Sequence, residues 1–225
     1  MERVGAIVPA AGQSVRMAGI DKLFVPLCDR PLLAWCVEAL ESSVLVGEVV
    51  ISVAAQTANL VERMAQERGW RKTRLVEGGV RRQDSVMNAL KILNDVDWII
   101  VHDGDRPFLT DALIERGLCS ARETGVAVAA VPLKDTVKMV KDNMVVRTLD
   151  RDDLRAVQTP QIFRTEILRE AHVGFGNTVT DDATLAEGLG CRVRLYDGSH
   201  ENLKVTTPDD LVLARAIANR WMERR

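Results

Sequence analysis

Cysteine is scarce in this chain, which has four cysteines among its 225 residues. Cys28, Cys36, Cys119 and Cys191 lie far apart, and no two of them form a C-x-x-C pair. This spacing excludes a zinc knuckle and a disulfide framework, because both need cysteines at short, recurring intervals. Reduced thiols in a cytoplasmic protein are the simplest interpretation.

The chain also lacks an excess of charge and long apolar runs. Thirty basic side chains against thirty-two acidic ones leave a net charge of −2, which does not favour binding to nucleic acid or to an anionic membrane. No run approaches the roughly 18 apolar residues of a membrane span, and residues 1–4 do not begin a secretion signal. We expect a soluble, cytoplasmic protein whose partners are small molecules or another protein chain.

Two common nucleotide-binding motifs are missing as well. The first glycine-containing loop has Ser14 where a dinucleotide-binding G-x-G-x-x-G loop needs glycine, and no acidic residue closes the segment Val53-Ala54-Ala55-Gln56. The G-K-[ST] triplet of a P-loop does not occur anywhere in the chain. These absences argue against NAD binding and against ATPase chemistry of the P-loop type.

What the sequence does contain at this place is a loop suited to phosphate. The apolar residues 4–8 predict a buried strand, and the small residues Ala10, Ala11 and Gly12 follow it. Small side chains let backbone N–H groups approach an anion, while Arg16 and Lys22 supply positive charge. Either cation alone would more often be a solvated surface residue. Together with the loop, they indicate nucleotide or phosphate chemistry.

Short apolar runs alternate with amphipathic segments along the whole chain. With 47% hydrophobic residues, the chain can bury a large core, and we expect residues 1–225 to form a single α/β domain. The pattern predicts a mostly parallel mixed sheet with helices on both faces, a Rossmann-like three-layer sandwich. We expect strands near residues 4–9, 48–54, 73–77, 97–102, 126–132 and 192–196, and helices near 31–43, 57–68, 82–94, 110–124, 164–172, 180–189 and 208–223.

Residues 134–151 interrupt this alternation. Segments 136–140 and 144–148 read as two strands joined through Lys141-Asp142-Asn143, which predicts a projecting β-hairpin arm. An isolated hairpin is marginally stable in water, so Val137, Met139 and Val145 need a surface to cover them. That surface is either the parent domain or a second subunit in a homodimer with exchanged arms.

Several ordered motifs resemble one enzyme family. The first loop resembles that of the sugar-phosphate nucleotidylyltransferases, and the later motifs narrow the resemblance to the methylerythritol phosphate cytidylyltransferases over residues 4 to about 215. The motifs are Pro9-Ala10-Ala11-Gly12-x-x-x-Arg16-Met17 with Lys22, Gly78-Gly79-x-x-Arg82-Gln83-x-Ser85, Val101-His102-Asp103-x-x-Arg106-Pro107, Asp135-Thr136-Val137-Lys138, Asp150-Arg151, Gln158-Thr159-Pro160-Gln161-x-Phe163, Thr180-Asp181-Asp182-Ala183 and Asn202-x-Lys204-Val205-Thr206.

The resemblance implies transfer of CMP from CTP to 2-C-methyl-D-erythritol 4-phosphate, in the non-mevalonate isoprenoid pathway. It implies three groups of residues: Arg16, Lys22 and Lys204 as catalytic residues; Ala10, Ala11, Gly12, Gly78, Gly79, Arg82, Ser85 and Asp103 in nucleotide binding; and Asp103, Arg106, Thr136, Arg151 and Lys204 in binding the acceptor. Thr136 and Arg151 would serve the neighbouring subunit.

The residue types suit this chemistry, although simpler interpretations stay open. The acceptor phosphate is already an anion near neutral pH, so the three histidines need not supply a general base. Asp103, after a very apolar strand, is the expected Mg²⁺ ligand, or else it caps the following loop. Gly78 and Gly79 either face the cytosine or only form a turn. Arg106 either binds phosphate or braces its loop.

The chain departs from the commoner forms of the family at Ser14, Asp21, Val80 and Gly104-Asp105. Asp105 adds negative charge close to the expected phosphate site, where it either joins the metal shell or points to solvent. Two other functions remain open, a ribitol 5-phosphate cytidylyltransferase and a noncatalytic nucleotide-binding module.

Overall fold

The computed structural model describes residues 2–12, 22–174 and 179–223. The elements are, in order, β1 (Val4–Ala10), η2 (Lys22–Phe24), β2 (Pro26–Leu27), β3 (Arg30–Pro31), α1 (Leu32–Ser42), β4 (Glu48–Val53), η3 (Ala55–Thr57), α2 (Ala58–Glu67), β5 (Thr73–Glu77), α3 (Arg82–Ile92), β6 (Trp98–Val101), α4 (Asp111–Thr124), β7 (Val126–Pro132), β8 (Lys138–Lys141), β9 (Met144–Thr148), η4 (Arg151–Asp153), β10 (Arg155–Arg164), α5 (Thr165–Gly174), α6 (Asp182–Gly188), β11 (Arg194–Asp197) and α7 (Pro208–Glu223). The expected strands and helices are present, and their bounds agree within two residues.

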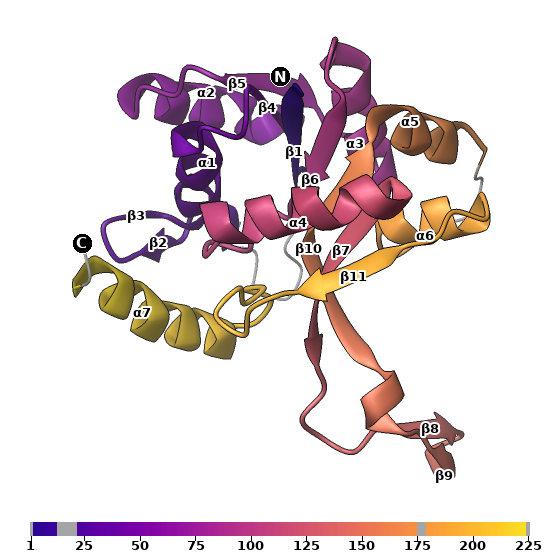
Figure 1. Cartoon of the computed structure of the whole chain (residues 1–225). Coiled ribbons are helices and arrows are strands. Elements are labelled where there is room, and N and C mark those ends of the chain that lie inside the picture. The colour runs from indigo at the N-terminus through magenta and orange to yellow at the C-terminus, as the bar shows by residue number, and fades with distance from the viewer. Residues whose placement is uncertain (1, 13–21, 175–178, 224–225) are drawn as a thin grey trace.

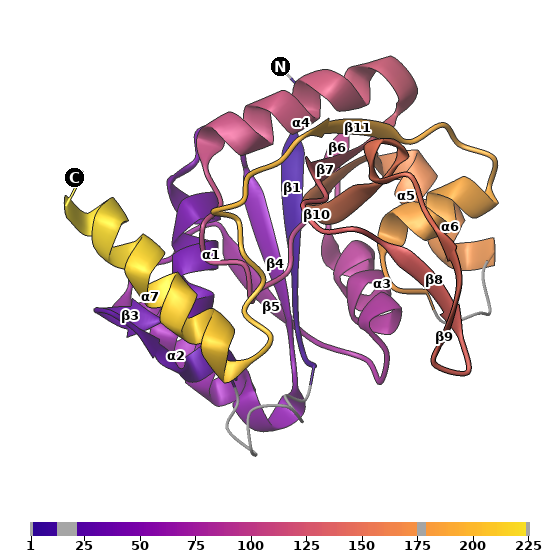
Figure 2. The same cartoon turned by 90° about the horizontal axis from the view of Figure 1, so that it is seen from below.

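A seven-stranded sheet forms the centre of the molecule, in the order β11-β7-β10-β6-β1-β4-β5 (Figures 1 and 2). Strands β4 and β6 pair in parallel with β1 on its two sides, β5 pairs in parallel with β4, and β11 pairs in parallel with β7. Strand β10 runs antiparallel to both β6 and β7. The mostly parallel mixed sheet expected from the sequence is therefore confirmed.

Strand β10 is absent from the strands expected from the sequence. Pro160 lies inside it, and proline is disfavoured within a paired strand because it lacks an N–H donor. The register with β7 shifts between Val157 and Gln161, so the residues around the proline leave the ladder. The irregularity lets the strand accommodate Pro160 between two paired neighbours.

Both faces of the sheet are covered by helices, as expected for a three-layer sandwich. Side chains alternate between the faces along each strand, so Ala6 and Val8 of β1 join one core cluster while Ile7 joins the other. The first cluster contains residues of α1, α2 and α4, and the second contains residues of α3, α5 and α6. This double coverage explains why the central strands are apolar on both faces.

Helix α7 lies outside these layers and packs on α1. Trp221 of α7 meets Phe108 with ring centroids 5.2 Å apart, and Phe108 meets Trp35 of α1 at 6.0 Å. These aromatic contacts belong to a third apolar cluster, which also includes Leu27. Between β11 and α7, the chain contacts the loop after β6, where the Val205 N–H donates to the Asp105 carbonyl oxygen at 2.9 Å.

The β8–β9 hairpin projects from the end of the sheet between β7 and β10 (Figure 1). Its turn residues Asp142 and Asn143 have φ values of 50° and 60°, a conformation that Asn and Asp tolerate in tight hairpin turns. Every residue of both strands is exposed, including Met139 and Val145. The parent domain therefore does not provide the covering surface that these apolar side chains need.

None of the helices that the structure describes is both long and apolar enough to cross a bilayer.

Candidate active site

A cavity of about 300 Å³ opens where β1 and β6 end, a position at which parallel sheets commonly bind ligands. Its walls come from five segments: the end of β1, the start of η2, the β5–α3 connection with the first turn of α3, the loop after β6 and the loop after β11. The lining residues are Pro9, Ala10, Ala11, Gly12, Lys22, Leu23, Gly79, Val80, Arg81, Arg82, Ser85, Asp103, Asp105, Lys204 and Thr206.

Two glycines permit close packing along the wall that the β5–α3 connection forms. A Cβ atom on Gly78 would lie 2.2 Å from the Cβ of Ala11, and one on Gly79 would lie 2.2 Å from the Cβ of Asp84. Both distances are far below contact, so only glycine permits this approach. The Ser85 hydroxyl accepts the Gly79 N–H at 3.1 Å, which fixes the glycine backbone along the cavity wall.

Asp103 is the centre of charge in this cavity. Nε of Arg82 lies 3.2 Å from Asp103 Oδ1, and Nζ of Lys204 lies 3.0 Å from Oδ2. Nε of Arg106 lies 3.6 Å from Oδ2. Burial alone would raise the pKa of the Asp103 carboxyl, but the three cations, Arg82 foremost, outweigh burial and hold that pKa well below its ordinary value. The carboxylate is therefore ionised across the physiological pH range.

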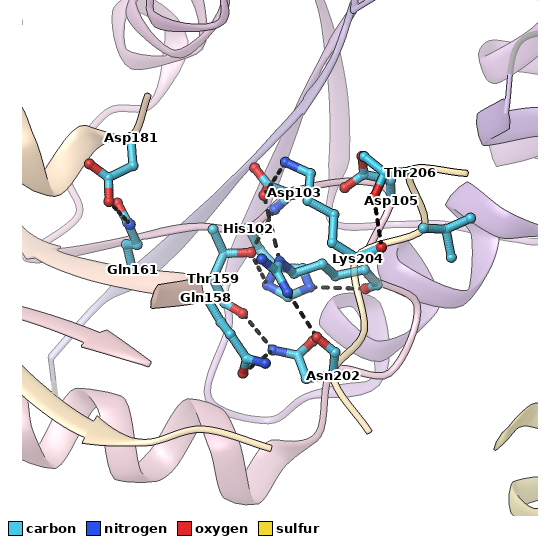
Figure 3. Close-up of polar contacts among 12 residues, drawn as sticks. His102, Asp103, Asp105, Gln158, Thr159, Gln161, Asp181, Asn202, Lys204 and Thr206 are labelled. Carbon is cyan, nitrogen blue, oxygen red and sulfur yellow. Dashed lines mark hydrogen bonds and ion pairs between the residues drawn. The ribbon is translucent and has the colours of Figure 1, made fainter. Parts of the chain in front are cut away.

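A buried histidine orients the loop that carries Asp103 (Figure 3). His102 Nε2 lies 3.0 Å from the Arg106 carbonyl oxygen, which can only accept, so Nε2 carries the proton. Nδ1 then accepts from the Thr159 hydroxyl at 3.1 Å, and that hydroxyl accepts the Asp103 N–H at 3.0 Å. Burial lowers the pKa of His102 to about 4, which keeps the ring neutral at pH 7.

Arg106 lies on the protein side of this loop and does not line the cavity. Its Nη1 donates to the Asn202 carbonyl at 2.9 Å, and the Asn202 side-chain amide donates to the Thr159 carbonyl at 2.6 Å. Gln158 continues the network by donating to the Ser199 carbonyl at 2.9 Å. Of the two roles left open by the sequence, this geometry favours bracing of the loop.

Lys22 and Asp105 face each other across the cavity wall. Lys22 Nζ donates to Asp105 Oδ2 at 2.6 Å and to the Val205 carbonyl oxygen at 3.0 Å. The sequence left Asp105 either in a metal shell or in solvent; the structure buries this carboxylate and pairs it with the lysine, so it does not point to solvent.

Asp182, which the sequence did not identify as a site residue, forms an ion pair with Arg82. In the sequence, Asp182 stands out only as part of the motif Thr180-Asp181-Asp182-Ala183, in which Asp181 is the N-cap of α6 and accepts the Thr184 N–H. The fully buried Asp182 carboxylate binds Arg82 Nη1 at 2.5 Å and His172 Nε2 at 3.0 Å. Burial opposes its charge, but Arg82 outweighs burial and lowers the pKa of Asp182.

Among the described residues, four that the sequence predicted do not line the cavity: Gly78, Arg106, Thr136 and Arg151. Arg16 lies outside the described residues, so the structure does not place it. Thr136 and Arg151 are exposed at the base of the arm, where Arg151 Nη1 donates to the Lys134 carbonyl at 2.9 Å. They do not line the cavity of their own chain.

A metal ion would have few protein ligands here. Within residues 2–12, 22–174 and 179–223, no group of three or more His, Cys, Asp or Glu side chains is placed to hold one. Mg²⁺, however, commonly binds through one or two carboxylates together with substrate phosphates. The ionised Asp103 at the cavity suits that single-carboxylate arrangement.

Comparison with known proteins decides the family. The family model described as 2-C-methyl-D-erythritol 4-phosphate cytidylyltransferase matches residues 4–220. The chain belongs to this family. A cytidylyltransferase of this name from Dehalococcoides mccartyi strain 195 is 41% identical over 218 residues, which is 96% of each chain. One from Bacillus cytotoxicus is 41% identical over 216 residues, 94% of this chain and 96% of the other.

Solved structures agree with this membership. The 2-C-methyl-D-erythritol 4-phosphate cytidylyltransferase of Thermus thermophilus is 32% identical, with a TM-score of 0.78 over 95% of this chain and 98% of that one. The 4-diphosphocytidyl-2C-methyl-D-erythritol synthase of Anaerococcus prevotii is 25% identical, with a TM-score of 0.85 over 97% and 99%. The fold and the activity expected from the sequence are thereby confirmed, and the chain is a nucleotidyltransferase.

Four of the family motifs quoted from the sequence converge in space. Residues from the first loop, the Gly78-Gly79 segment, the His102-Asp103 segment and the Lys204 segment all contribute to one cavity. Thr159 of the Gln158-Thr159 motif supports the loop after β6: its hydroxyl accepts the Asp103 N–H, and its carbonyl oxygen accepts from the Asn202 amide.

Proposed function

We propose that this cavity is where the cytidylyltransferase binds CTP and transfers CMP to 2-C-methyl-D-erythritol 4-phosphate. The observation that carries the proposal is the convergence of Lys22, Arg82 and Lys204 on one cavity beside the backbone of Ala10–Gly12. Cations beside small residues at the end of a parallel strand are suited to a triphosphate.

The nucleotide would lie across the two glycine-containing walls. Ala10, Ala11 and Gly12 leave their backbone accessible to phosphates, and Gly78 and Gly79 present a flat backbone to the cytosine and ribose. Ser85 supports that wall through its bond to Gly79. Val80, fully exposed at the cavity rim, would face the base edge.

In the reaction, an acceptor phosphate oxygen attacks the α-phosphorus of CTP. A new P–O bond forms as the bond from the α-phosphorus to the β-bridging oxygen breaks, and that oxygen leaves with its electron pair as pyrophosphate. The attacking phosphate monoester is already ionised, since its second pKa is about 6. No general base is needed, which agrees with a neutral His102 that donates into its own loop.

Catalysis is then mainly a matter of neutralising and positioning phosphates. We assign Lys22, Lys204 and Arg16 to stabilise the charge that develops in the transition state. Each removal should lower kcat by about 10²–10³-fold, as for other fixed donors in enclosed sites. Lys204 also contacts Asp103, so its position is fixed before substrate binds.

Mg²⁺ is the proposed cofactor, with Asp103 as its protein ligand and substrate phosphates as the others. When bound, the ion would neutralise charge on the triphosphate. Asp103 meanwhile keeps Arg82 and Lys204 in place. Arg106 is proposed to act on the acceptor by holding this loop in position.

The arm is the proposed dimerisation element, residues 134–151, within one domain of 225 residues. Its exposed Met139 and Val145 would be covered by a second subunit, and Thr136 and Arg151 would contact the acceptor phosphate in the partner's cavity. Mixing two inactive variants tests this: Lys22→Ala and Arg151→Ala subunits should regain activity as heterodimers. Continued inactivity after proven subunit exchange would contradict a shared site.

Substrate choice is tested by pyrophosphate release from CTP and Mg²⁺. We expect turnover with 2-C-methyl-D-erythritol 4-phosphate and little with ribitol 5-phosphate. Faster turnover of ribitol 5-phosphate would assign the alternative acceptor, and no turnover of either would leave a noncatalytic nucleotide-binding module. Because both substrates are charged metabolites, we propose the cytoplasm as the location, which cell fractionation checks.

A further inference from the structure

The Lys22 ammonium has two of its donors assigned within the protein. They point to the Asp105 carboxylate at 2.6 Å and to the Val205 carbonyl at 3.0 Å. An ammonium group carries three N–H donors, and the third has no partner among residues 2–12, 22–174 and 179–223, so it can serve a ligand. Both Lys22 and Asp105 line the cavity, and their side chains are only 16% and 10% exposed. The pair therefore presents one oriented N–H donor of Lys22 to a ligand in the cavity.

The main chain holds Asp105 in place from two directions. Its carbonyl oxygen accepts the Val205 N–H at 2.9 Å, which ties the loop after β6 to the segment that also binds Lys22. On the other side, His102 donates to the carbonyl of the next residue, Arg106. Val205 thus contacts both members of the pair, because its N–H donates to Asp105 and its carbonyl oxygen accepts from Lys22.

A contribution to the stability of the fold does not by itself explain why an acid occupies position 105. Asp105 Oδ1 is buried and has no hydrogen-bond partner among the described residues. A buried unpartnered oxygen is unfavourable, and an ion pair selected for stability would engage both oxygens. The contact that Oδ2 makes with Lys22 offers a functional reason to retain the acid.

We propose that Asp105 is a positioning residue for the transfer reaction, which holds the Lys22 ammonium with its free N–H directed at the phosphates. This inference rests on the proposed function, in which Lys22 stabilises the transition state. Asp105 touches neither reactant in this account. A displacement of about 1 Å in a catalytic group can lower the rate about 100-fold, so the anchor matters even without contact.

A double-mutant cycle on the full-length protein tests the idea, because a residue that acts only through another has no effect once the other is gone. Asp105→Ala should lower kcat by about 10–100-fold without raising the KM for CTP. Asp105→Asn, which keeps an acceptor oxygen, should stay within about fivefold of wild type. In a Lys22→Ala background, Asp105→Ala should change kcat less than about twofold. If the alanine variant does not fold, Asp105→Ser takes its place.

The matched control removes an ion pair far from the cavity. Glu2→Ala breaks the exposed contact between Glu2 and Arg122, 2.6 Å long, and should leave kcat unchanged. Three results would overturn the proposal: full activity of Asp105→Ala, an equal loss of kcat in the Lys22→Ala background, or recovery of the lost rate at raised Mg²⁺, which would mark a metal ligand. Failure of the proposed function is distinguishable, because it would appear as a Lys22→Ala variant with the wild-type rate.

Discussion

His102 should make the stability of this cytidylyltransferase depend on pH in a range where carboxylates contribute little. The ring is buried, and burial lowers its pKa from 6.5 to about 4. Between these values the unfolded chain binds a proton that the native ring does not, so stability is lost as the pH falls from about 6.5 to about 4. The full difference corresponds to about 3 kcal/mol.

Most of that loss occurs within a convenient range. For a ring with these two pKa values, the free energy of unfolding should be about 2 kcal/mol lower at pH 5 than at pH 7. Urea titrations at both pH values measure this difference in the wild type. His102→Gln keeps a donor toward Arg106 and His102→Asn keeps an acceptor toward Thr159, but neither side chain titrates.

Both variants should lose about 2 kcal/mol less than the wild type between pH 7 and pH 5, whatever their stability at pH 7. His200 is exposed, so His200→Gln serves as the matched control and should keep the wild-type dependence. Parallel pH dependences for the wild type and both His102 variants would refute the conclusion that the buried ring is neutral.

Three further perturbations have defined outcomes. Asp182→Ala removes the fully buried one of the two carboxylates that pair with Arg82, the other being Asp103, and should lower the free energy of unfolding by about 1–3 kcal/mol in urea; an unchanged stability would contradict the pairing. Gly78→Ala places a Cβ 2.2 Å from that of Ala11 and should weaken CTP binding at least about tenfold by calorimetry, whereas unchanged affinity would rule out this close approach as a requirement. Val145→Asp on the exposed arm should give monomers in sedimentation, and a persistent dimer would place the interface elsewhere.

Local patterns were sufficient for most of the fold. The continuous apolar run of β1 and the amphipathic spacing of the helices indicated which elements form, because a strand covered on both faces needs apolar side chains on both. Strand β10 escaped prediction since Pro160 and the register shift beside it hide its strand character. The one strand of the central sheet that was missed is thus the one whose local sequence disagrees with its place in the sheet.

For the site, the sequence motifs predicted the functional residues but not the contacts between them. Lys204 and Asp103 were recognised separately and meet in space at 3.0 Å. The partners of Lys22 and Arg82 were not foreseen, because Asp105 and Asp182 lie 83 and 100 residues away from them. The local sequence around a buried acid does not indicate which cation it pairs with, so only the tertiary structure identifies the pair.

A crystal structure of the enzyme with CTP bound tests the central claim most directly. The account predicts the triphosphate in the cavity, within hydrogen-bond distance of Lys22 and Lys204, with the cytosine against Gly78 and Gly79. A nucleotide bound elsewhere, with Lys22 still turned only toward Asp105, would contradict it.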